Sequence, residues 1–354
     1  MKGYGMRCIG SPAWLEKDIP VCGPLDAIIQ PTMVAVCSSD THILHGGFGE
    51  HKDLILGHEA VGIVAEVGSM VRGFRPGDYV VVPCSTPDWL SPTIQSTPSN
   101  AHDRGLMQSF KFIGSKDGIF AERFHVNQAD ANLALLPDGV TPEQALMTVD
   151  MMSTGYHGVE LAEIGFGDTV VVIGIGPVGL MALSGAAIRG AGRIIAVGTR
   201  KPCVEAAVYY GATDIISYKA GDIADQVLEM TKGGADKVII AGGSAETFTQ
   251  AVRMTREMGT VANVNFFDHS ETLGFPAMLW GVGMANKDIR GGFCPGGARR
   301  IQKMLALIQA GRVDPARIIS HKLHGFTKLP EAVELMDSKS PELIKPIVYF
   351  DDLA

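Results

Sequence analysis

The residues best suited to bind a metal or take part in a reaction are a cysteine, a histidine and a glutamate in the first part of the chain. Cys37 is followed a short way downstream by Gly57-His58-Glu59-Ala60-Val61-Gly62. A thiolate and an imidazole together suit zinc, and a carboxylate is a common further partner. A catalytic zinc takes three protein ligands and keeps one position open, so these residues predict a metal site whose third ligand has to be found. Taken alone, Cys37 and His58 are equally typical of a small buried hydrophobe and a hydrogen-bonded structural histidine.

A glycine-rich loop in the middle of the chain predicts a dinucleotide site. The apolar run Thr169–Ile173 reads as a strand, and it is followed by Gly-Ile-Gly-Pro-Val-Gly and a helix-compatible stretch. Gly174 permits a tight turn, Gly176 lets the backbone approach a pyrophosphate, and Gly179 allows close packing of helix on strand. The amino terminus of the helix then offers free N–H groups and a positive dipole end to the phosphates.

The end of the next strand indicates which nucleotide binds. An NAD site carries Asp or Glu there to hold the ribose hydroxyls, whereas this chain has Val-Gly-Thr-Arg-Lys over 197–201. No carboxylate repels a 2′-phosphate, Thr199 can donate a hydrogen bond, and Arg200 can pair with the phosphate in fork geometry. The alternative is that Arg200 and Lys201 are solvated charges that open a helix; we favour NADP. The candidate cofactor residues are Gly174, Gly176, Pro177, Val178, Gly179, Gly198, Thr199, Arg200 and Tyr218.

The elements that must position these residues indicate two domains, the natural number for 354 residues. The first ~150 residues read as short strands broken by turns, for example Ala60–Val71 and Tyr79–Val82. Beyond them, strands and helices alternate, which predicts a parallel sheet with helices on both faces. The polar stretch from 85 to 118 predicts a long surface loop, either a lid or an oligomer contact. The closing strand Pro346–Phe350 could belong to either domain.

Composition excludes several classes of function. A net charge of -8 and a pI near 5.7 argue against a nucleic-acid or anionic-membrane surface. The six scattered cysteines form no disulfide-like pattern, and no apolar run resembles a signal peptide, so we expect a cytoplasmic protein. The uncharged stretch Thr169–Ile188 is long enough to cross a bilayer, but its four glycines and one proline predict a strand, a turn and a helix instead.

In combination, these features resemble the zinc-dependent medium-chain alcohol dehydrogenases. The run Gly57–Gly62, followed by Gly68 and Val71, matches the zinc signature of that family, and Cys37–His42 matches the segment that supplies the first ligand. The resemblance covers essentially the whole chain. It is strongest to the NADP-dependent secondary-alcohol, or isopropanol, dehydrogenases, on the stretches Thr86–Trp89, Asp117–Gly118, Ala129–Ala134 and Gly292–Gly297.

The resemblance implies an α/β fold of two parts. A GroES-like β-rich catalytic domain would span 1–150, and a Rossmann domain with a doubly wound parallel sheet would span 151–292. The segment 293–354 would return to the catalytic domain. A homotetramer is also implied.

The resemblance supplies the missing ligand as well. Asp150 stands before Ser-Thr-Gly-Tyr, where many relatives have a second cysteine and where the secondary-alcohol subgroup has aspartate. Cys37, His58 and Asp150 would then bind zinc, and Glu59 would be a further ligand that can leave. Asp40 would accept the far N–H of His58. An alternative interpretation of Asp150 is a helix N-terminal carboxylate stabilised by the helix dipole.

A second, structural zinc is not expected. Many relatives carry four closely spaced cysteines in the loop after the zinc signature, whereas this chain has only Cys84 there. The secondary-alcohol subgroup shares this loss.

The implied reaction is reversible hydride transfer between NADPH and small ketones or aldehydes, with the corresponding alcohols as the reduced partners. Zinc would polarise the substrate oxygen as a Lewis acid. Ser39 would pass a proton to or from that oxygen, and His42 would carry it toward solvent. The alternatives are a turn residue for Ser39 and a surface hydrogen bond for His42.

The substrate pocket is placed by resemblance alone. Phe110 falls where relatives often have tryptophan, and Phe266 where they have tyrosine, which would enlarge and dry the pocket. We therefore expect secondary alcohols and ketones to be preferred over primary alcohols. The candidate pocket residues are Phe110, Phe266, Trp280 and Cys294.

Three other functions fit parts of the pattern. A zinc-free quinone or enone reductase of the same fold would lack the Cys/His/Asp set. A non-catalytic NADP-binding protein would have no reason to keep the ligands and the relay. A methyltransferase would use the glycine loop for S-adenosylmethionine, which the basic end of the second strand disfavours.

Overall fold

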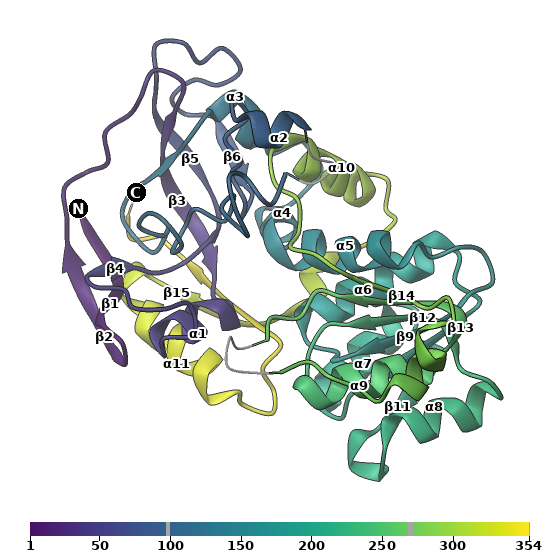
Figure 1. The fold of residues 1–354 in the computed structure, drawn as a ribbon. Helices are drawn as coiled ribbons and strands as arrows, with labels where there is room; N and C mark the ends of the chain where they lie inside the picture. Colours follow the sequence, from purple (N-terminus) through teal and green to yellow (C-terminus); the bar gives the residue numbers. More distant parts are fainter. Residues whose placement is uncertain (97–99, 268–271, 354) are drawn as a thin grey trace. The chain divides into compact units, whose positions relative to one another are not determined.

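The computed structural model describes residues 1–96, 100–267 and 272–353 and divides the chain into two compact units. The first unit comprises residues 1–153 together with 295–354, and the second comprises residues 154–294 (Figure 1). Their boundaries lie a few residues from the ranges that the sequence suggested. Each unit carries one of the two candidate sites, so each is described by itself.

The first unit is built on two β-sheets. The smaller has the strand order β2-β1-β4, and the larger has the order β15-β16-β3-β5-β6-β8, with β7 also paired to β3. The strands are β1 (Lys2–Cys8), β2 (Ser11–Glu16), β3 (Ala27–Ala35), β4 (Leu54–Ile55), β5 (Glu59–Val67), β6 (Tyr79–Val82), β7 (Phe124–Val126), β8 (Ala134–Leu135), β15 (Ile319–His324) and β16 (Lys345–Tyr349).

Short helices surround these sheets. They are α1 (Ser38–Leu44), α2 (Pro92–Ser96), α3 (Ala129–Asn132), α4 (Pro142–Met147), the π-helix η1 (Thr148–Met152), α10 (Ala298–Gln309), the 3₁₀ turns η4 (Pro315–Ile318) and η5 (Phe326–Lys328), and α11 (Leu329–Ser338).

The pairing of β3 with β5 determines where the candidate ligands lie. The two strands are antiparallel, and Ala35 at the end of β3 pairs with Glu59 at the start of β5. Because antiparallel strands bring the end of one beside the start of the other, the residues just past β3 meet the residues just before β5. Cys37 and His58 are those residues.

The C-terminal strand completes the same sheet. β16 runs antiparallel to β3, with Ile347 opposite Ala35 and Val348 opposite Val34. Both Ile347 and Val348 are fully buried. The closing strand, which the sequence left unassigned, therefore belongs to the first unit, and its first residue, Lys345, lies close to the end of β3.

Two expectations for this unit need correction. The strand expected over Ala60–Val71 starts one residue earlier and ends at Val67. The segment 85–118 is not simply a surface loop, because Ser85, Asp103 and Phe112 are buried and a short helix, α2, lies within it. Its polar residues are thus partly packed inside the unit, and positions 97–99 lie outside the described residues.

The second unit has the expected α/β organisation. Its strands are all parallel in the order β11-β10-β9-β12-β13-β14, so β9 and β12 lie side by side where the order changes direction. The elements are α5 (Ser153–Ala162), β9 (Thr169–Ile173), α6 (Pro177–Arg189), β10 (Arg193–Val197), α7 (Lys201–Tyr209), β11 (Asp214–Ile216), η2 (Tyr218–Ala220), α8 (Ile223–Thr231), β12 (Ala235–Ile240), α9 (Ala245–Met254), β13 (Thr255–Asn263), η3 (Ala277–Gly283) and β14 (Asp288–Gly291).

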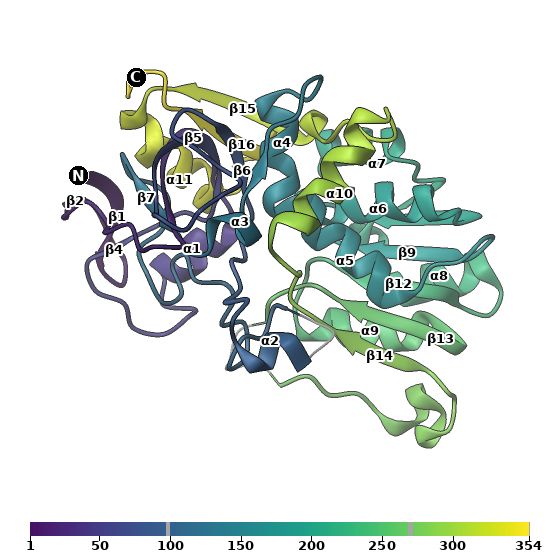
Figure 2. The same cartoon turned by 90° about the horizontal axis from the view of Figure 1, so that it is seen from above.

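Helices cover both faces of this sheet (Figure 2). α8 and α9 pack their apolar sides against one set of strand residues, which includes Val171, Ile195 and Val238. A strand that is covered on both faces needs a continuous apolar sequence, which explains the run Thr169–Ile173. The stretch Thr169–Ile188 is divided between β9, a turn and α6. Among the described residues, none of the helices has the length and apolar character required to cross a membrane.

Candidate active site

The first unit brings together the four residues that the sequence proposed as metal ligands. One ligand atom from each of Cys37, His58, Glu59 and Asp150 lies within 4.8 Å of all the others. His58 and Glu59 are buried, and the side chain of Asp150 is 13% exposed. Cys37 is the residue before α1, His58 and Glu59 begin β5, and Asp150 lies in the π-helix η1.

The distances within this cluster suit a bound cation. His58 Nε2 lies 3.4 Å from Asp150 Oδ2 and 3.8 Å from Glu59 Oε1, and Cys37 Sγ lies 3.8 Å from Asp150 Oδ2. His58 Nε2 and Glu59 Oε2 are buried and make no hydrogen bond in the described part of the chain. Buried polar atoms are normally paired, so a buried nitrogen and a buried oxygen without hydrogen bonds, on two neighbouring residues of the cluster, fit a metal ion. One sulfur, one imidazole and carboxylates form a ligand set that zinc accepts.

Asp40 ties the two ligand-bearing segments together. Its Oδ2 accepts a hydrogen bond from the backbone N–H of Cys37 at 2.9 Å, and its Oδ1 accepts one from the N–H of Gly57 at 3.1 Å. Oδ1 also lies 3.1 Å from His58 Nδ1. A carboxylate can only accept, so Nδ1 carries the proton and Nε2 is left as the metal-binding nitrogen.

Gly57 is required by its backbone and its surroundings. It has a φ of +95°, in the region that favours glycine, and a Cβ there would lie 2.3 Å from the ring of Phe120. Phe120 is fully buried. The glycine before His58 therefore lets the chain pass the aromatic ring and turn into β5.

The pKa values of two candidate ligands, His58 and Glu59, are raised, so protons compete with a metal for these side chains. Burial by itself lowers the pKa of His58, but Asp40, together with Asp150 and Cys37, raises that pKa well above its usual value. Burial raises the pKa of Glu59 to about 7, with Lys345 opposing the shift and Asp150 adding to it. A metal must displace these protons, so its binding should weaken as the pH falls.

The two interpretations of Asp150 are compatible in the structure. Asp150 lies in the first turn of η1, although η1 continues directly from α4, which begins at Pro142. A π-turn bulges one residue out of the helical register and is frequent at functional sites. Here it accompanies the placement of the Asp150 carboxylate beside His58.

Sequence reasoning missed Lys345, which contacts this cluster. Its side chain is fully buried, and Nζ lies 2.5 Å from Glu59 Oε1. A signal was present, because Lys345 is the only charged residue in the apolar run Leu343–Phe350. A lysine inside a buried strand requires an anionic partner, but the sequence does not say which one.

The proposed relay residues lie on α1. Ser39 is half-buried in its first turn, and its Oγ lies 3.7 Å from Cys37 Sγ. His42, three residues later, is exposed. The ring of Phe110 stands edge-on to the ring of His58 with 5.1 Å between centroids, so this residue does lie beside the candidate ligands.

The other expected pocket residues belong to the second unit. Phe266 follows β13 and is 38% exposed, and Cys294 is buried. Trp280 lies in η3, packs edge-on against Phe275, and donates a hydrogen bond from Nε1 to the carbonyl of Lys287.

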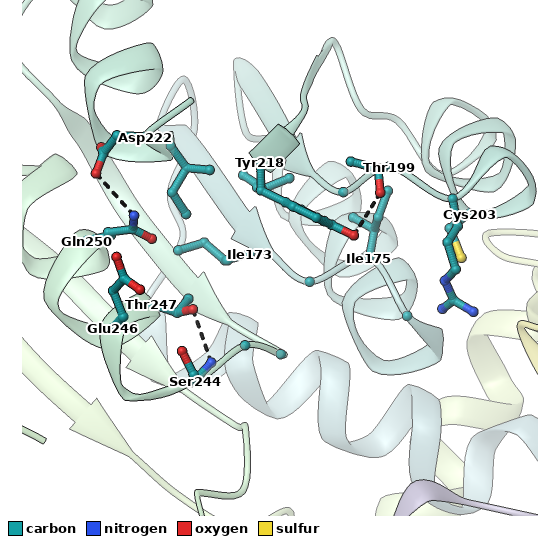
Figure 3. Close-up of a pocket in the computed structure, with 18 of the residues that line it drawn as sticks. Ile173, Ile175, Thr199, Cys203, Tyr218, Asp222, Ser244, Glu246, Thr247 and Gln250 are labelled. Carbon is teal, nitrogen blue, oxygen red and sulfur yellow. Dashed lines mark hydrogen bonds between the residues drawn. The ribbon is translucent and has the colours of Figure 1, made fainter. Parts of the chain in front are cut away.

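The second unit contains a pocket of about 680 Å³ at the carboxyl ends of its strands (Figure 3). Its size is ordinary for a cofactor site. It is lined by six of the expected cofactor residues, namely Gly174, Gly176, Gly198, Thr199, Arg200 and Tyr218. The hydroxyl of Thr199 donates to that of Tyr218 at 2.8 Å, so these two side chains form a hydrogen-bonded pair at one end of the pocket.

The remaining candidate residues of the glycine loop belong to the helix that follows it, α6. Pro177, Val178 and Gly179 form the first turn of α6 and do not line the pocket. A Cβ on Gly179 would lie 1.9 Å from the carbonyl oxygen of Gly174, which shows how closely this helix meets the turn after β9. Gly174 has a φ of +87°, and a Cβ on Gly176 would meet nothing within 4 Å. The space beside Gly176 is thus open for a ligand.

Sequence reasoning missed the other end of the pocket. Ser244 and Thr247 are linked by a hydrogen bond from the Ser244 N–H, and Gln250 donates to Asp222 at 3.1 Å (Figure 3). These residues start or lie on α8 and α9, and no short motif marks them. Their convergence depends on the order of the strands.

Comparisons with known proteins identify the family of the chain. Residues 23–138 match the alcohol dehydrogenase GroES-like domain, and residues 177–310 match the zinc-binding dehydrogenase family. Among solved structures, the alcohol dehydrogenase TADH from Thermus sp. ATN1 is similar with a TM-score of 0.84 and 31% identity, over 99% of both chains. The zinc-dependent alcohol dehydrogenase 2 from Streptococcus pneumonia is similar with a TM-score of 0.88 and 27% identity, also over 99% of both chains.

The chain therefore belongs to the zinc-binding alcohol dehydrogenase family. Within it, the chain is 52% identical to the NADP-dependent isopropanol dehydrogenase of Thermoanaerobacter brockii, covering 98% of this chain and 99% of the relative. It is 51% identical to the enzyme of the same name from Clostridium beijerinckii, with the same coverage. A third such enzyme, from Entamoeba histolytica, is 51% identical over 99% of this chain and 97% of its own.

The first prediction concerns Asp40. Asp40→Asn should weaken zinc binding by about 10- to 100-fold, because the amide has one acceptor atom for three donors and no charge to orient His58. Competition with a chromogenic chelator measures the affinity. Asp130→Asn is the matched control, since the Asp130 carboxylate also accepts backbone N–H groups, from Arg72 and Gly73, but on the surface. Equal zinc affinities of the two variants would contradict the assigned role.

Proposed function

We propose that the protein is a zinc- and NADP-dependent secondary-alcohol dehydrogenase that also reduces small ketones and aldehydes. The observation that carries the proposal is the convergence of Cys37, His58 and Asp150 in one largely buried cluster, in which His58 Nε2 makes no hydrogen bond with any described residue. A dinucleotide pocket in the same chain supplies the redox partner. Full-length relatives near 50% identity are named as NADP-dependent isopropanol dehydrogenases, which supports the substrate class.

The two cofactors supply the reactive groups. Zinc held by Cys37, His58 and Asp150 provides a Lewis acid for the substrate oxygen, and the nicotinamide gives or takes a hydride at the carbon. The protein's own part is to orient these groups and to move a proton. Asp40 holds His58 with Nε2 directed at the cluster. Phe110 contributes an apolar wall next to His58.

The proton moves along α1 in this proposal. The hydroxyl of Ser39 can accept a proton from an alcohol and donate one of its own, which suits the first position of a relay. Ser39 is half-buried near Cys37, and His42, one helical turn later, is exposed. A proton passed from Ser39 to His42 would thus travel from the cluster to solvent. Reduction of a ketone uses the same path in reverse.

Recognition of NADP is assigned to one end of the pocket in the second unit. Arg200 and the hydrogen-bonded pair of Thr199 and Tyr218 offer a cation and hydroxyl groups to a 2′-phosphate. Gly198 stands where an NAD-dependent enzyme would carry an acid. A Cβ on Gly198 would lie 2.2 Å from Ile175, so a larger residue there would also disturb the glycine loop.

We also propose that the chain forms a homotetramer in the cytoplasm. In the described part of the second unit, β14 is the edge strand beside β13, and Met278, Val282 and Met284 near it are more than half exposed. Unpaired strand edges and clustered apolar side chains are typical of association surfaces. A monomeric mass in light scattering would contradict this part of the proposal.

The proposed activity is tested with purified protein and a small substrate panel. We expect about one zinc per chain, oxidation of NADPH with acetone, and a higher kcat/KM for 2-propanol than for 1-propanol. Removal of zinc by a chelator should abolish turnover, and adding zinc back should restore it. A zinc-free protein that reduces enones would indicate the quinone reductase alternative instead, and a higher kcat/KM for 1-propanol would overturn the substrate class.

The cofactor assignment is tested at Arg200. Arg200→Ala should raise the KM for NADPH by about tenfold or more, because a charge-assisted contact to the 2′-phosphate is lost, and should leave the KM for NADH nearly unchanged. Lys201→Ala is the matched control, since Lys201 is exposed and does not line the pocket. A similar change in KM for both nucleotides would contradict the role of Arg200.

A further inference from the structure

The contact between Lys345 and Glu59 has no role in the reaction described so far. Lys345 is the first residue of β16, its side chain is fully buried, and Nζ lies 2.5 Å from Glu59 Oε1. The other carboxylate oxygen, Oε2, is buried and makes no hydrogen bond with any described residue. Oε1, which also lies 3.8 Å from His58 Nε2, is therefore the oxygen that the lysine and a metal at the cluster would share, and Oε2 is a buried oxygen without a hydrogen bond.

The backbone around Lys345 keeps the ammonium group in place. Ser320 on the neighbouring strand β15 accepts a hydrogen bond from the Lys345 N–H at 3.1 Å and donates one to its carbonyl at 3.4 Å. On the other side, the N–H of Val36 donates to the carbonyl of Pro346 at 3.3 Å. The lysine thus projects from a strand that is anchored at both edges, and its position relative to Glu59 is determined by the sheet.

The negative charge of the metal ligands explains why a lysine is buried beside them. Among the ligands, a thiolate at Cys37 and carboxylates at Glu59 and Asp150 carry three negative charges, one more than a divalent metal neutralises. The nearby Asp40 carboxylate is compensated separately, by two backbone N–H groups and His58. A buried charge without a partner is strongly destabilising, so the third anion needs a cation other than the metal. Lys345 is in direct contact with Glu59 and supplies that cation.

We propose that Lys345 is a positioning residue that competes with the metal for the carboxylate of Glu59. The lysine offers Glu59 a second partner, so that the carboxylate can release the metal position when the substrate oxygen arrives. Without the lysine, Glu59 has no lysine or arginine partner among the described residues, so the carboxylate turns to the metal and holds the position that the substrate needs. This inference rests on the proposed function, because it requires a metal at the cluster.

A purely structural role would have different consequences. If Lys345 only neutralised a buried charge, its loss would reduce stability and leave the affinity of outside ligands for the metal unchanged. The proposal instead predicts that outside ligands bind more weakly, because Glu59 then holds the position that they need. The affinity of an outside ligand therefore separates the two roles, whereas the metal affinity rises in both, because a nearby cation is lost.

The test uses the holoenzyme with cobalt in place of zinc, because cobalt reports its coordination through visible absorption. Imidazole is the probe that competes with Glu59 for the open position. Lys345→Met, a variant of similar size without charge, should raise the imidazole Kd by about tenfold, and should slow metal transfer to a chelator by a similar factor. Lys345→Arg keeps the charge and should behave as the unmodified protein does. An unchanged imidazole Kd in a folded, cobalt-loaded Lys345→Met variant overturns the proposal.

Glu59→Gln provides the second arm, because an amide is a weak ligand for the metal. In the Glu59→Gln background, Lys345→Met should leave the imidazole Kd unchanged, since Lys345 acts through Glu59. A change of tenfold or more in that background overturns the proposal. If either single variant does not fold, the double variant, which contains neither Glu59 nor Lys345 as a buried charge, is compared directly with the unmodified protein. Its imidazole Kd should then be no higher than that of the unmodified protein, because no Glu59 carboxylate competes for the metal, and a Kd raised tenfold overturns the proposal.

The metal content separates this inference from the proposed function. If cobalt and zinc do not bind the unmodified protein, the proposed function fails together with its metal site. If the metal binds, ketone reduction proceeds, and the imidazole Kd does not depend on Lys345, the proposed function stands and only the role of Lys345 is lost.

Discussion

The metal cluster depends on the buried carboxylate of Asp40, which is not itself a metal ligand. Asp40 accepts hydrogen bonds from the N–H of Cys37 and the N–H of Gly57, and it orients the ring of His58. It therefore joins the segment that leaves β3 to the segment that enters β5. The strand register brings these segments near each other, and Asp40 sets the distance and the tautomer. These hydrogen bonds orient the ligand segments independently of the metal, which reduces the cost of ordering its ligands.

The same cluster shows how a protein can bury several negative groups at one point. Three anionic side chains and a histidine converge where there is little water, which is tolerable only with compensating cations. The metal is one of these cations, and Lys345 is the other. Because the two cations share Glu59, the network that makes burial acceptable also determines how firmly the carboxylate holds the metal.

The nucleotide pocket is built differently, because local sequence makes one end of it. Gly174 and Gly176 form the turn after β9, and α6 begins immediately, so loop and helix N-terminus are adjacent by chain connectivity. Thr199 and Arg200 follow the neighbouring parallel strand and therefore reach the same edge of the sheet. Only residues such as Asp222 and Gln250, which come from later crossovers, require the full strand order to reach the pocket.

The sequence by itself determined the elements of the second unit and the types of residue at both sites. Its apolar strands and glycine loop are local signals, and Cys37 and His58 are recognisable from their chemistry, whereas Asp150 came from resemblance to a family. Only the tertiary structure decided which charged side chains of the first unit contact one another. Glu59 and Lys345 are 286 positions apart, and they meet because β16 returns to pair with β3. Contacts over such separations follow from strand order and register, and residue type alone does not specify them.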